Sequence, residues 1–260
     1  MERSFMLILV LITLIATIAY VFSPSTVRVA VNESEEVKTS VANESIGFNF
    51  TIPENVTGNV VSIEVPAVDN EGRGVTVNLT LEVIPGKGRA LTNINQILFW
   101  VDTQHSIRTA LKVASNVTGI NVSKYDFIYS ISTNASVIEG TSAGAALTVL
   151  TIAALLNKTI NPNVTITGTI NHDGTIGPVG QVLEKGKAAS RAGKKIFLVP
   201  LGQGSTVKYV EKKHCEKYGF VTFCTTELIP KKVSISKEVG IRVVEVGNIH
   251  EALNYLLANK

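Results

Sequence analysis

The stretch that most constrains the fold runs from residue 139 to residue 156 and reads E-G-T-S-A-G-A-A-L-T-V-L-T-I-A-A-L-L. Its second half is an apolar run of good helix formers, which predicts a helix. Ser142 lies just ahead of this run, between Gly140 and Gly144. The free N–H groups and the dipole of a helix N-terminus favour negative charge. The pattern therefore indicates a nucleophilic serine whose oxyanion the helix end would stabilise.

A second stretch, residues 164–193, predicts a strand, a turn at Asp173-Gly174 and a helix that a glycine closes. Lys185 shares one face of that helix with apolar residues, namely Val182, Ala189 and Ala192. An apolar environment disfavours the charged form of a lysine, so its pKa falls and it can act as a base. Ser142 and Lys185 would then form a Ser-Lys dyad. The residues alone also allow a purely structural role, with small residues for packing and a lysine whose tip reaches water.

Both stretches resemble the proteolytic domain of Lon proteases. The segment G-T-S-A-G-A-A-L is similar to the family's nucleophile segment, and T-G-T-I-N-H-D-G-T-I-G-P-V-G-Q-V-L-E-K-G-K-A-A is similar to its lysine segment. The resemblance implies that Ser142 is the nucleophile and Lys185 the general base. It also implies that the hydroxyl of Thr167 helps to position the lysine. Glu139 stands at a site near the nucleophile where the family usually has an acidic residue.

The resemblance covers residues 58–258. The segment 83–92 is similar to the family's opening strand and turn, and the C-terminal I-R-V-V-E-V-G-N-I-H-E-A-L-N-Y-L-L is similar to its closing strand and helix. One departure stands just before the lysine helix, where the family usually has a pair of glycines and this chain has Gly180-Gln181. We expect this change to alter the substrate groove without removing the dyad. The family also implies assembly into six-membered rings.

The chain contains no G-x-x-x-x-G-K-[ST] phosphate loop. We therefore expect an ATP-independent serine endopeptidase that acts on unfolded or flexible polypeptides. The expected partners are such substrates, the membrane and other copies of the chain. No cofactor or metal ion is expected. Because the net charge is only +3 and no dense basic block exists, nucleic acid is not expected as a partner.

Periodicity predicts the remaining elements. Alternating apolar residues in 58–87 predict a β-hairpin or meander with a turn at 70–72, and residues 125–131 also alternate as in a strand. Further predictions are a helix over 94–117, strands over 195–199 and 239–246, and a helix over 249–257. Residues 201–235 show no clear pattern and are expected to be irregular. This mixture of strands and helices predicts an α+β fold, or loosely a mixed α/β fold.

The N-terminal residues 5–22 are uncharged and mostly apolar. At about 1.5 Å per residue their length is just sufficient to span a bilayer. A signal-peptide core is usually shorter, so an uncleaved anchor is favoured over a cleaved signal. We therefore expect an anchor or signal over 1–22, a polar stalk with a first strand over 23–57, and the Lon-like proteolytic domain over 58–260.

Two features favour an extracytosolic or secreted domain. Asparagine sequons recur along the chain and suit an extracytosolic surface, although a polar sheet surface explains some of them; they begin at residues 32, 43, 49, 55, 78, 116, 121, 134, 157 and 163. The chain has two cysteines, Cys215 and Cys224, too few to complete a zinc site with His214. A disulfide between them, across a hairpin turn at Tyr218-Gly219, is expected in an oxidising compartment.

Two other functions compete with the dyad. Residues 140–144 also fit G-x-S-x-G, the nucleophile elbow of α/β-hydrolases, for which Asp173 and either His214 or His250 have the right chain order. That fold needs several strand-helix units before the serine, and the chain offers one clear helix there. The second alternative is a catalytically inactive surface domain that binds peptides without cutting them.

Overall fold

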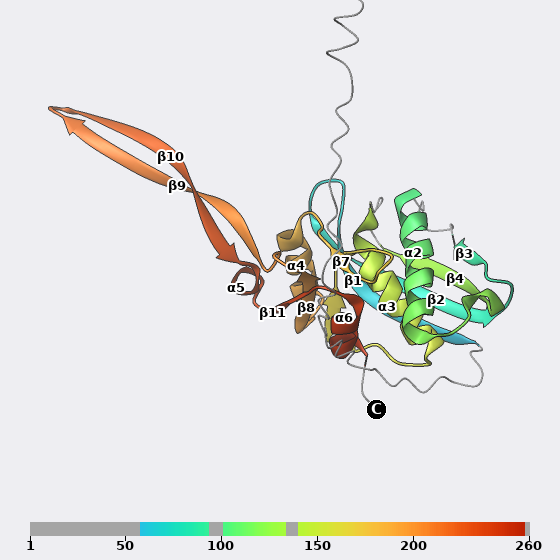
Figure 1. Cartoon of the computed structure of the whole chain (residues 1–260). Coiled ribbons are helices and arrows are strands. Elements are labelled where there is room, and N and C mark those ends of the chain that lie inside the picture. Colours follow the sequence, from blue (N-terminus) through green and yellow to red (C-terminus); the bar gives the residue numbers. More distant parts are fainter. Residues whose placement is uncertain (1–57, 94–100, 134–139, 258–260) are drawn as a thin grey trace, which may run out of the picture. The chain divides into compact units, whose positions relative to one another are not determined.

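The computed structural model describes residues 58–93, 101–133 and 140–257 (Figure 1). The chain divides into two units, Met1–Gly47 and Phe48–Lys260, and the described residues belong to the second. The expected anchor, the stalk with its first strand, and Glu139 lie outside the described residues. No helix in the described ranges is long and apolar enough to cross a membrane.

The first half of the domain forms a four-stranded sheet in the order β1-β2-β4-β3. Its strands are β1 (Asn59–Val68), β2 (Gly74–Pro85), β3 (Ala90–Asn93) and β4 (Tyr125–Ser132). Strands β1 and β2 are antiparallel and the turn between them lies at 70–72, so the predicted hairpin is confirmed. Alternate side chains enter the core, among them Ile63, Val65, Leu79 and Leu81.

Helix α3 (Gly144–Leu155) packs on this sheet, and α2 (Val101–Thr118) packs on α3. Every residue of α3 is buried, because the helix contacts β1 and β2 as well as α2 and α6 (Ile249–Leu256). The predicted helix after Ser142 is thus confirmed, and burial on all sides explains why its sequence is apolar all round. Short 3₁₀ turns precede β4 and α3, namely η1 (Val122–Lys124) and η2 (Thr141–Ala143).

The second half contains a three-stranded parallel sheet in the order β11-β8-β5. Its strands are β5 (Val164–Ile166), β8 (Ile196–Pro200) and β11 (Arg242–Val246). A small hairpin of β6 (Thr169–Ile170) and β7 (Ile176–Gly177) leads into α4 (Val182–Arg191). A separate small core of apolar residues joins α4, β8 and α5 (Ile235–Val239): Val182, Ala189, Phe197, Val199, Ile235 and Val239. This core fixes the helix that carries Lys185.

The predicted strand over 239–246 is correct only in its second part. Residue 239 is the last residue of α5, and Gly240, with φ 73°, ends that helix in the left-handed conformation. Strand β11 begins at Arg242. A five-residue helix is too short to display a helical period in sequence, which is why its signal was absent.

The prediction that residues 201–235 are irregular is wrong. They form a long antiparallel hairpin of β9 (Ser205–Tyr218) and β10 (Val221–Ser234), which stands clear of the rest of the domain in Figure 1. The strands are exposed on both faces, so no alternation of apolar and polar residues marks them. Gly219 has φ 65° at the first position of the two-residue turn, as a type II′ turn requires.

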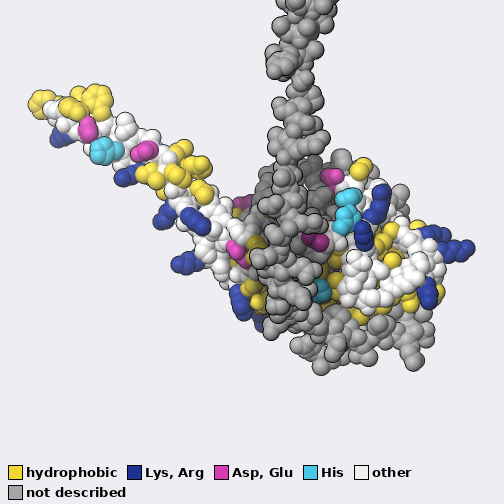
Figure 2. Space-filling model, viewed as in Figure 1, with side chains coloured by type: hydrophobic (Ala, Val, Ile, Leu, Met, Phe, Trp, Pro, Cys, Tyr) yellow, Lys and Arg dark blue, Asp and Glu magenta, His cyan; other side chains and the backbone are white. Residues whose placement is uncertain are grey.

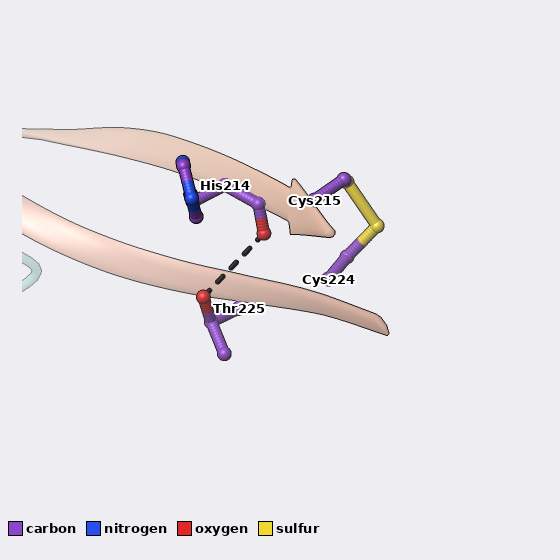
Figure 3. The surroundings of a disulfide bond; sticks show 4 residues. All are labelled: His214, Cys215, Cys224 and Thr225. Carbon is purple, nitrogen blue, oxygen red and sulfur yellow. Dashed lines mark hydrogen bonds between the residues drawn. A yellow bond between two sulfur atoms is a disulfide. The ribbon is translucent and has the colours of Figure 1, made fainter. Parts of the chain in front are cut away.

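The predicted disulfide is present in this hairpin. Cys215 and Cys224 face each other across the two strands and are bonded (Figure 3). Beside them the hydroxyl of Thr225 donates to the carbonyl oxygen of His214 over 3.4 Å. The disulfide joins the fourth residue pair from the turn, and so it fixes the register of the two strands near the tip of the hairpin.

Candidate active site

Ser142 lies in the 3₁₀ turn η2, directly before α3, as the sequence predicts. Two glycines make this turn possible. Gly140 has φ 104°, a conformation that L side chains rarely adopt. Gly144 is packed so closely that a Cβ atom there would lie 2.8 Å from Cγ2 and 2.9 Å from the backbone nitrogen of Ile170. Both predicted supporting glycines therefore have a structural reason.

Backbone hydrogen bonds tie this turn to the segment between β5 and β6. The N–H of Gly168 donates to the carbonyl oxygen of Ser142 over 3.0 Å, and the N–H of Ala145 donates to the carbonyl oxygen of Gly168, also over 3.0 Å. The hydroxyl of Thr167 donates to the same Ser142 carbonyl over 3.4 Å. The backbone of Ser142 is thus fixed through its carbonyl oxygen, while the residue remains partly exposed.

Thr167 itself is buried, and its N–H donates to the carbonyl oxygen of Leu198 over 3.0 Å. These bonds place Thr167 against η2, the turn that carries the predicted nucleophile Ser142 and that we call the nucleophile turn. Its expected role in positioning Lys185 stays a prediction.

Lys185 lies on the buried face of α4 and is only 5% exposed. Burial lowers the pKa of its ammonium group from 10.5 to about 8, because the charged form loses its hydration. Glu184 is directed elsewhere and pairs with Lys187, with 2.7 Å between Oε1 and Nζ. The predicted division of the helix into an apolar face with one lysine and a charged face is confirmed.

Ser142 and Lys185 line the same cleft, which has a volume of about 700 Å³. Its walls come from the β1–β2 turn, the nucleophile turn and the loop before α4. The other lining residues are Val68, Asp69, Asn70, Gly72, Gly140, Thr141, Thr169, Pro178, Val179, Gly180 and Gln181. The structure therefore brings the two predicted dyad residues to one place from elements far apart in sequence.

The β1–β2 turn that forms one wall is braced by Asp69. Its carboxylate accepts hydrogen bonds from the N–H groups of Glu71, at 3.0 Å, and Arg73, at 2.9 Å, and pairs with the Arg73 guanidinium. The bond from the Arg73 backbone is the main cause that lowers the pKa of Asp69. Sequence reasoning located this turn and did not identify its brace.

The loop that forms the opposite wall is held by Gln203. The N–H of Val179 donates to Oε1 of Gln203 over 3.0 Å, and Nε2 of Gln203 donates to the carbonyl oxygen of Val179 over 2.7 Å. A side-chain amide thus satisfies both backbone groups of one cleft residue. Gln203 was missed because nothing in its local sequence indicates this contact 24 residues away.

Gln181 stands where the family usually has a glycine, and its backbone adopts the left-handed conformation with φ 57° and ψ 37°. Its carbonyl oxygen accepts the N–H of Lys185 over 3.1 Å and thereby begins α4. The departure noted in the sequence therefore falls on a backbone position that favours glycine. The exposed side chain of Gln181 enters the wall of the cleft.

No histidine is among the described residues that line this cleft. His214 lies on the hairpin, with its side chain 71% exposed and 3.4 Å from Glu216. Asp173 accepts hydrogen bonds from the N–H and the hydroxyl of Thr175. Asp173, His214 and His250 are all absent from the described lining of the cleft that holds Ser142, so this cleft offers no histidine–aspartate pair for the α/β-hydrolase alternative.

The described residues contain no group of three or more His, Cys, Asp or Glu side chains that could hold a metal ion. The groups that line the cleft include the hydroxyl of Ser142, the amine of Lys185 and the carboxylate of Asp69.

Several Lon proteases are similar to this chain. The Lon protease of Elusimicrobium minutum is 30% identical over 58% of this chain and 18% of its own length. The archaeal Lon protease of Thermoplasma volcanium is 26% identical over 64% of this chain and 27% of its own length. The Lon protease of Buchnera aphidicola subsp. Schizaphis graminum is 25% identical over 92% of this chain and 28% of its own length. The chain thus spans less than a third of each of these relatives.

The model of the Lon protease (S16) C-terminal proteolytic domain matches residues 103–233. This range is half of the chain and includes Ser142, Thr167 and Lys185. The mixed sheet-and-helix architecture agrees with the same domain. The chain therefore belongs to the family of Lon protease proteolytic domains.

Proposed function

We propose that this chain is a serine endopeptidase in which Ser142 is the nucleophile and Lys185 the general base. The observation that carries the proposal is the shared cleft, which is lined both by Ser142 and by a buried lysine of lowered pKa. A lysine with a pKa of about 8 is neutral in a useful fraction of molecules near pH 7 to 8. An exposed lysine at its ordinary value would be almost wholly protonated there.

The proposed reaction follows from these groups. The neutral amine of Lys185 accepts the hydroxyl proton of Ser142 while Oγ attacks the carbonyl carbon of the peptide. The resulting ammonium then gives that proton to the leaving amine, and the acyl group remains on Ser142. Water activated by the amine of Lys185 releases the acid product and restores the serine. The positive end of α3 faces the negative charge that develops on the substrate oxygen.

The substrate that suits this cleft is an extended polypeptide. Its walls are a β-turn and a loop rather than a deep enclosed pocket. A folded protein presents few segments that fit such walls, so we propose unfolded or flexible chains as substrates. Because the chain contains no phosphate loop, we further propose that this cleavage needs no ATP.

The test is degradation of casein by the full chain, with and without ATP. Replacement of Ser142 by Ala or of Lys185 by Met should each reduce the rate by about 10³-fold or more, and the double variant should be no worse than either alone. Lys187→Met is the matched control, because Lys187 lies on the outer face of the same helix. Casein degradation that persists in Ser142→Ala would refute the proposal.

A binding domain without catalysis predicts a different result. The natural chain would then bind casein without cutting it, and it would not react with a fluorophosphonate at Ser142. Labelling of Ser142 that follows the neutral fraction of Lys185 with pH would instead support the dyad.

The cellular location and the oligomeric state of the protein are separate proposals. We propose a membrane-anchored protein with an extracytosolic proteolytic domain, supported by the apolar segment 5–22 and by the disulfide. We also propose rings of this chain, as the family implies. Protease protection of the domain in intact cells tests the first, and the mass of the detergent-solubilised protein tests the second.

A further inference from the structure

The hairpin of β9 and β10 carries a cluster of large apolar side chains at its tip. Phe220 is fully exposed, at 106%, and Tyr218, Phe223 and Val221 are exposed at 65%, 62% and 54%. Figure 2 shows the corresponding apolar surface at the end of the hairpin. Soluble proteins rarely expose four large apolar residues side by side without a binding role.

Strand pairing places these side chains together. Val221 is opposite Tyr218, and Phe223 lies two residues further along the same face. The rings of Tyr218 and Phe223 meet edge to face, with 6.2 Å between their centroids. Phe220 projects from the turn itself. We name this group, Tyr218, Phe220, Val221 and Phe223, the tip cluster.

Lysines accompany the tip cluster along the strands, where Figure 2 shows basic side chains over much of the hairpin's length. The hairpin has six lysines against three glutamates: Lys208, Lys212, Lys213, Lys217, Lys231 and Lys232, and Glu211, Glu216 and Glu227. Lys208 is paired with Glu238 of α5. Nearest the tip, Glu216 is engaged with both Tyr218 and His214, while Lys217 faces Thr222.

We propose that the tip cluster inserts into the interfacial layer of a lipid bilayer that carries anionic headgroups. An apolar end with a tyrosine among its aromatic rings suits the boundary between acyl chains and headgroups, and lysines behind it attract anionic lipid. A second hairpin of this chain is a poorer partner, because two arms with an excess of lysine repel each other. The segment 5–22, uncharged and apolar, would keep the same bilayer within reach.

The architecture of the hairpin suits such a contact. Strands of 14 residues extend for roughly 45 Å, so the tip can touch a surface while the cleft remains accessible. A hairpin of two strands without a packed face is only marginally stable in water. The Cys215–Cys224 bond stands next to the tip cluster and holds it in one shape, so little conformational freedom is lost on insertion.

The experiment uses the full chain with an environment-sensitive fluorophore, NBD, on a cysteine at position 222. The two native cysteines are bonded to each other, so the variant Thr222→Cys offers a single free thiol. Thr226→Cys is the matched control, since it lies on the same face four residues further from the tip, about 13 Å away. The labelled proteins are reconstituted in vesicles of phosphatidylcholine alone or mixed equally with phosphatidylglycerol, with or without doxyl-labelled lipid.

In the mixed vesicles we expect blue-shifted emission at position 222 and quenching by doxyl lipid several times stronger than at position 226. High salt and pure phosphatidylcholine should both weaken the signal. Replacing Phe220 and Phe223 together by Ser should lower the quenching about tenfold, whereas Leu228→Ser, an exposed apolar residue away from the tip, should leave it unchanged. Casein cleavage in detergent should be equal in all these variants and shows that they are folded.

Two results would overturn the proposal. One is emission at position 222 that stays water-like in mixed vesicles, or quenching that survives loss of both phenylalanines. The other is a blue shift that appears in detergent without vesicles and grows with protein concentration, which would assign the tip cluster to contact between copies of the chain.

Discussion

The N–H of Gly168 donates to the carbonyl oxygen of Ser142 over 3.0 Å, and so joins the nucleophile turn to the segment that follows β5. The return bond from Ala145 to Gly168 makes the connection two-sided. The position of Ser142 therefore depends on close backbone approach at this point rather than on its own side chain.

The variant Gly144→Ala tests this dependence. The added Cβ would meet the backbone nitrogen of Ile170 at 2.9 Å, and a backbone atom cannot rotate away. We expect the turn with Ser142 to shift, casein cleavage to fall about 100-fold, and the domain to lose roughly 1–3 kcal/mol of stability. Chemical denaturation and steady-state rates measure the two effects. An unchanged rate with unchanged stability would show that the junction is looser than the structure indicates.

The rate should rise with pH through a pKa of about 8, because only the neutral form of Lys185 can accept the proton of Ser142. The relevant quantity is kcat/KM for a short fluorogenic peptide, measured with the free enzyme from pH 6 to pH 10. A histidine base would instead give a rise near its unperturbed value of about 6.5. A plateau already reached by pH 7 would therefore count against Lys185 as the base.

Lys185 should also reduce the stability of the domain. Its pKa lies near 8 in the folded chain against 10.5 ordinarily, so the unfolded chain binds the proton more tightly. The penalty is complete below about pH 8 and disappears as pH rises towards 10.5. At about 1.4 kcal/mol per pKa unit, Lys185→Met should stabilise the domain at pH 7 by roughly 3 kcal/mol while it abolishes cleavage.

Urea denaturation at pH 7 and pH 10 measures this effect, and the gain should shrink at the higher pH. Lys187→Met on the exposed side of α4 should change stability by less than about 0.5 kcal/mol. A Lys185→Met variant that is less stable than the natural chain at pH 7 would mean that the ammonium is well solvated.

Much of this site could be predicted from local sequence. The run after Ser142 is apolar all round because α3 is buried all round, and the single lysine among Val182 and Ala189 marks the inward face of α4. Both signals are short-range, since each depends on the period of one helix. They pointed to Ser142 and Lys185, the two residues of the proposed dyad, without any knowledge of how α3 and α4 pack.

The features that sequence reasoning missed depend on contacts between distant segments, or belong to strands that bury no face. Gln203 holds Val179 through a contact between distant segments, and Asp69 braces its turn through hydrogen bonds that many aspartates can make. The β9–β10 hairpin has no buried face, so no alternation reveals its strands. Its strongest local signals were the two cysteines, which predicted the disulfide, and Tyr218-Gly219, which predicted a turn one residue before the observed turn at Gly219-Phe220.

Gln181 should carry backbone strain that glycine would remove. A left-handed residue with a side chain costs about 1–2 kcal/mol, so Gln181→Gly should be about 1 kcal/mol more stable than Gln181→Ala, which keeps the strain and loses the long side chain. Thermal unfolding of the two variants provides the comparison. Both variants remove the long side chain, so we expect them to change KM for casein equally. An equal KM with different stabilities would separate the contribution of the Gln181 side chain to the cleft from the effect of its backbone on α4.

The disulfide should stabilise the hairpin and leave the cleft unaffected. Cross-linking a loop of this length lowers the conformational entropy of the unfolded chain, which stabilises the folded hairpin by roughly 2–3 kcal/mol. Replacing both Cys215 and Cys224 by Ser should therefore speed amide hydrogen exchange throughout the outer half of β9 and β10. Casein cleavage in detergent and the exchange of α3 should not change, because the hairpin contributes no residue to the lining of the cleft. Loss of cleavage on reduction, with α3 still protected, would show instead that the hairpin acts on the active site.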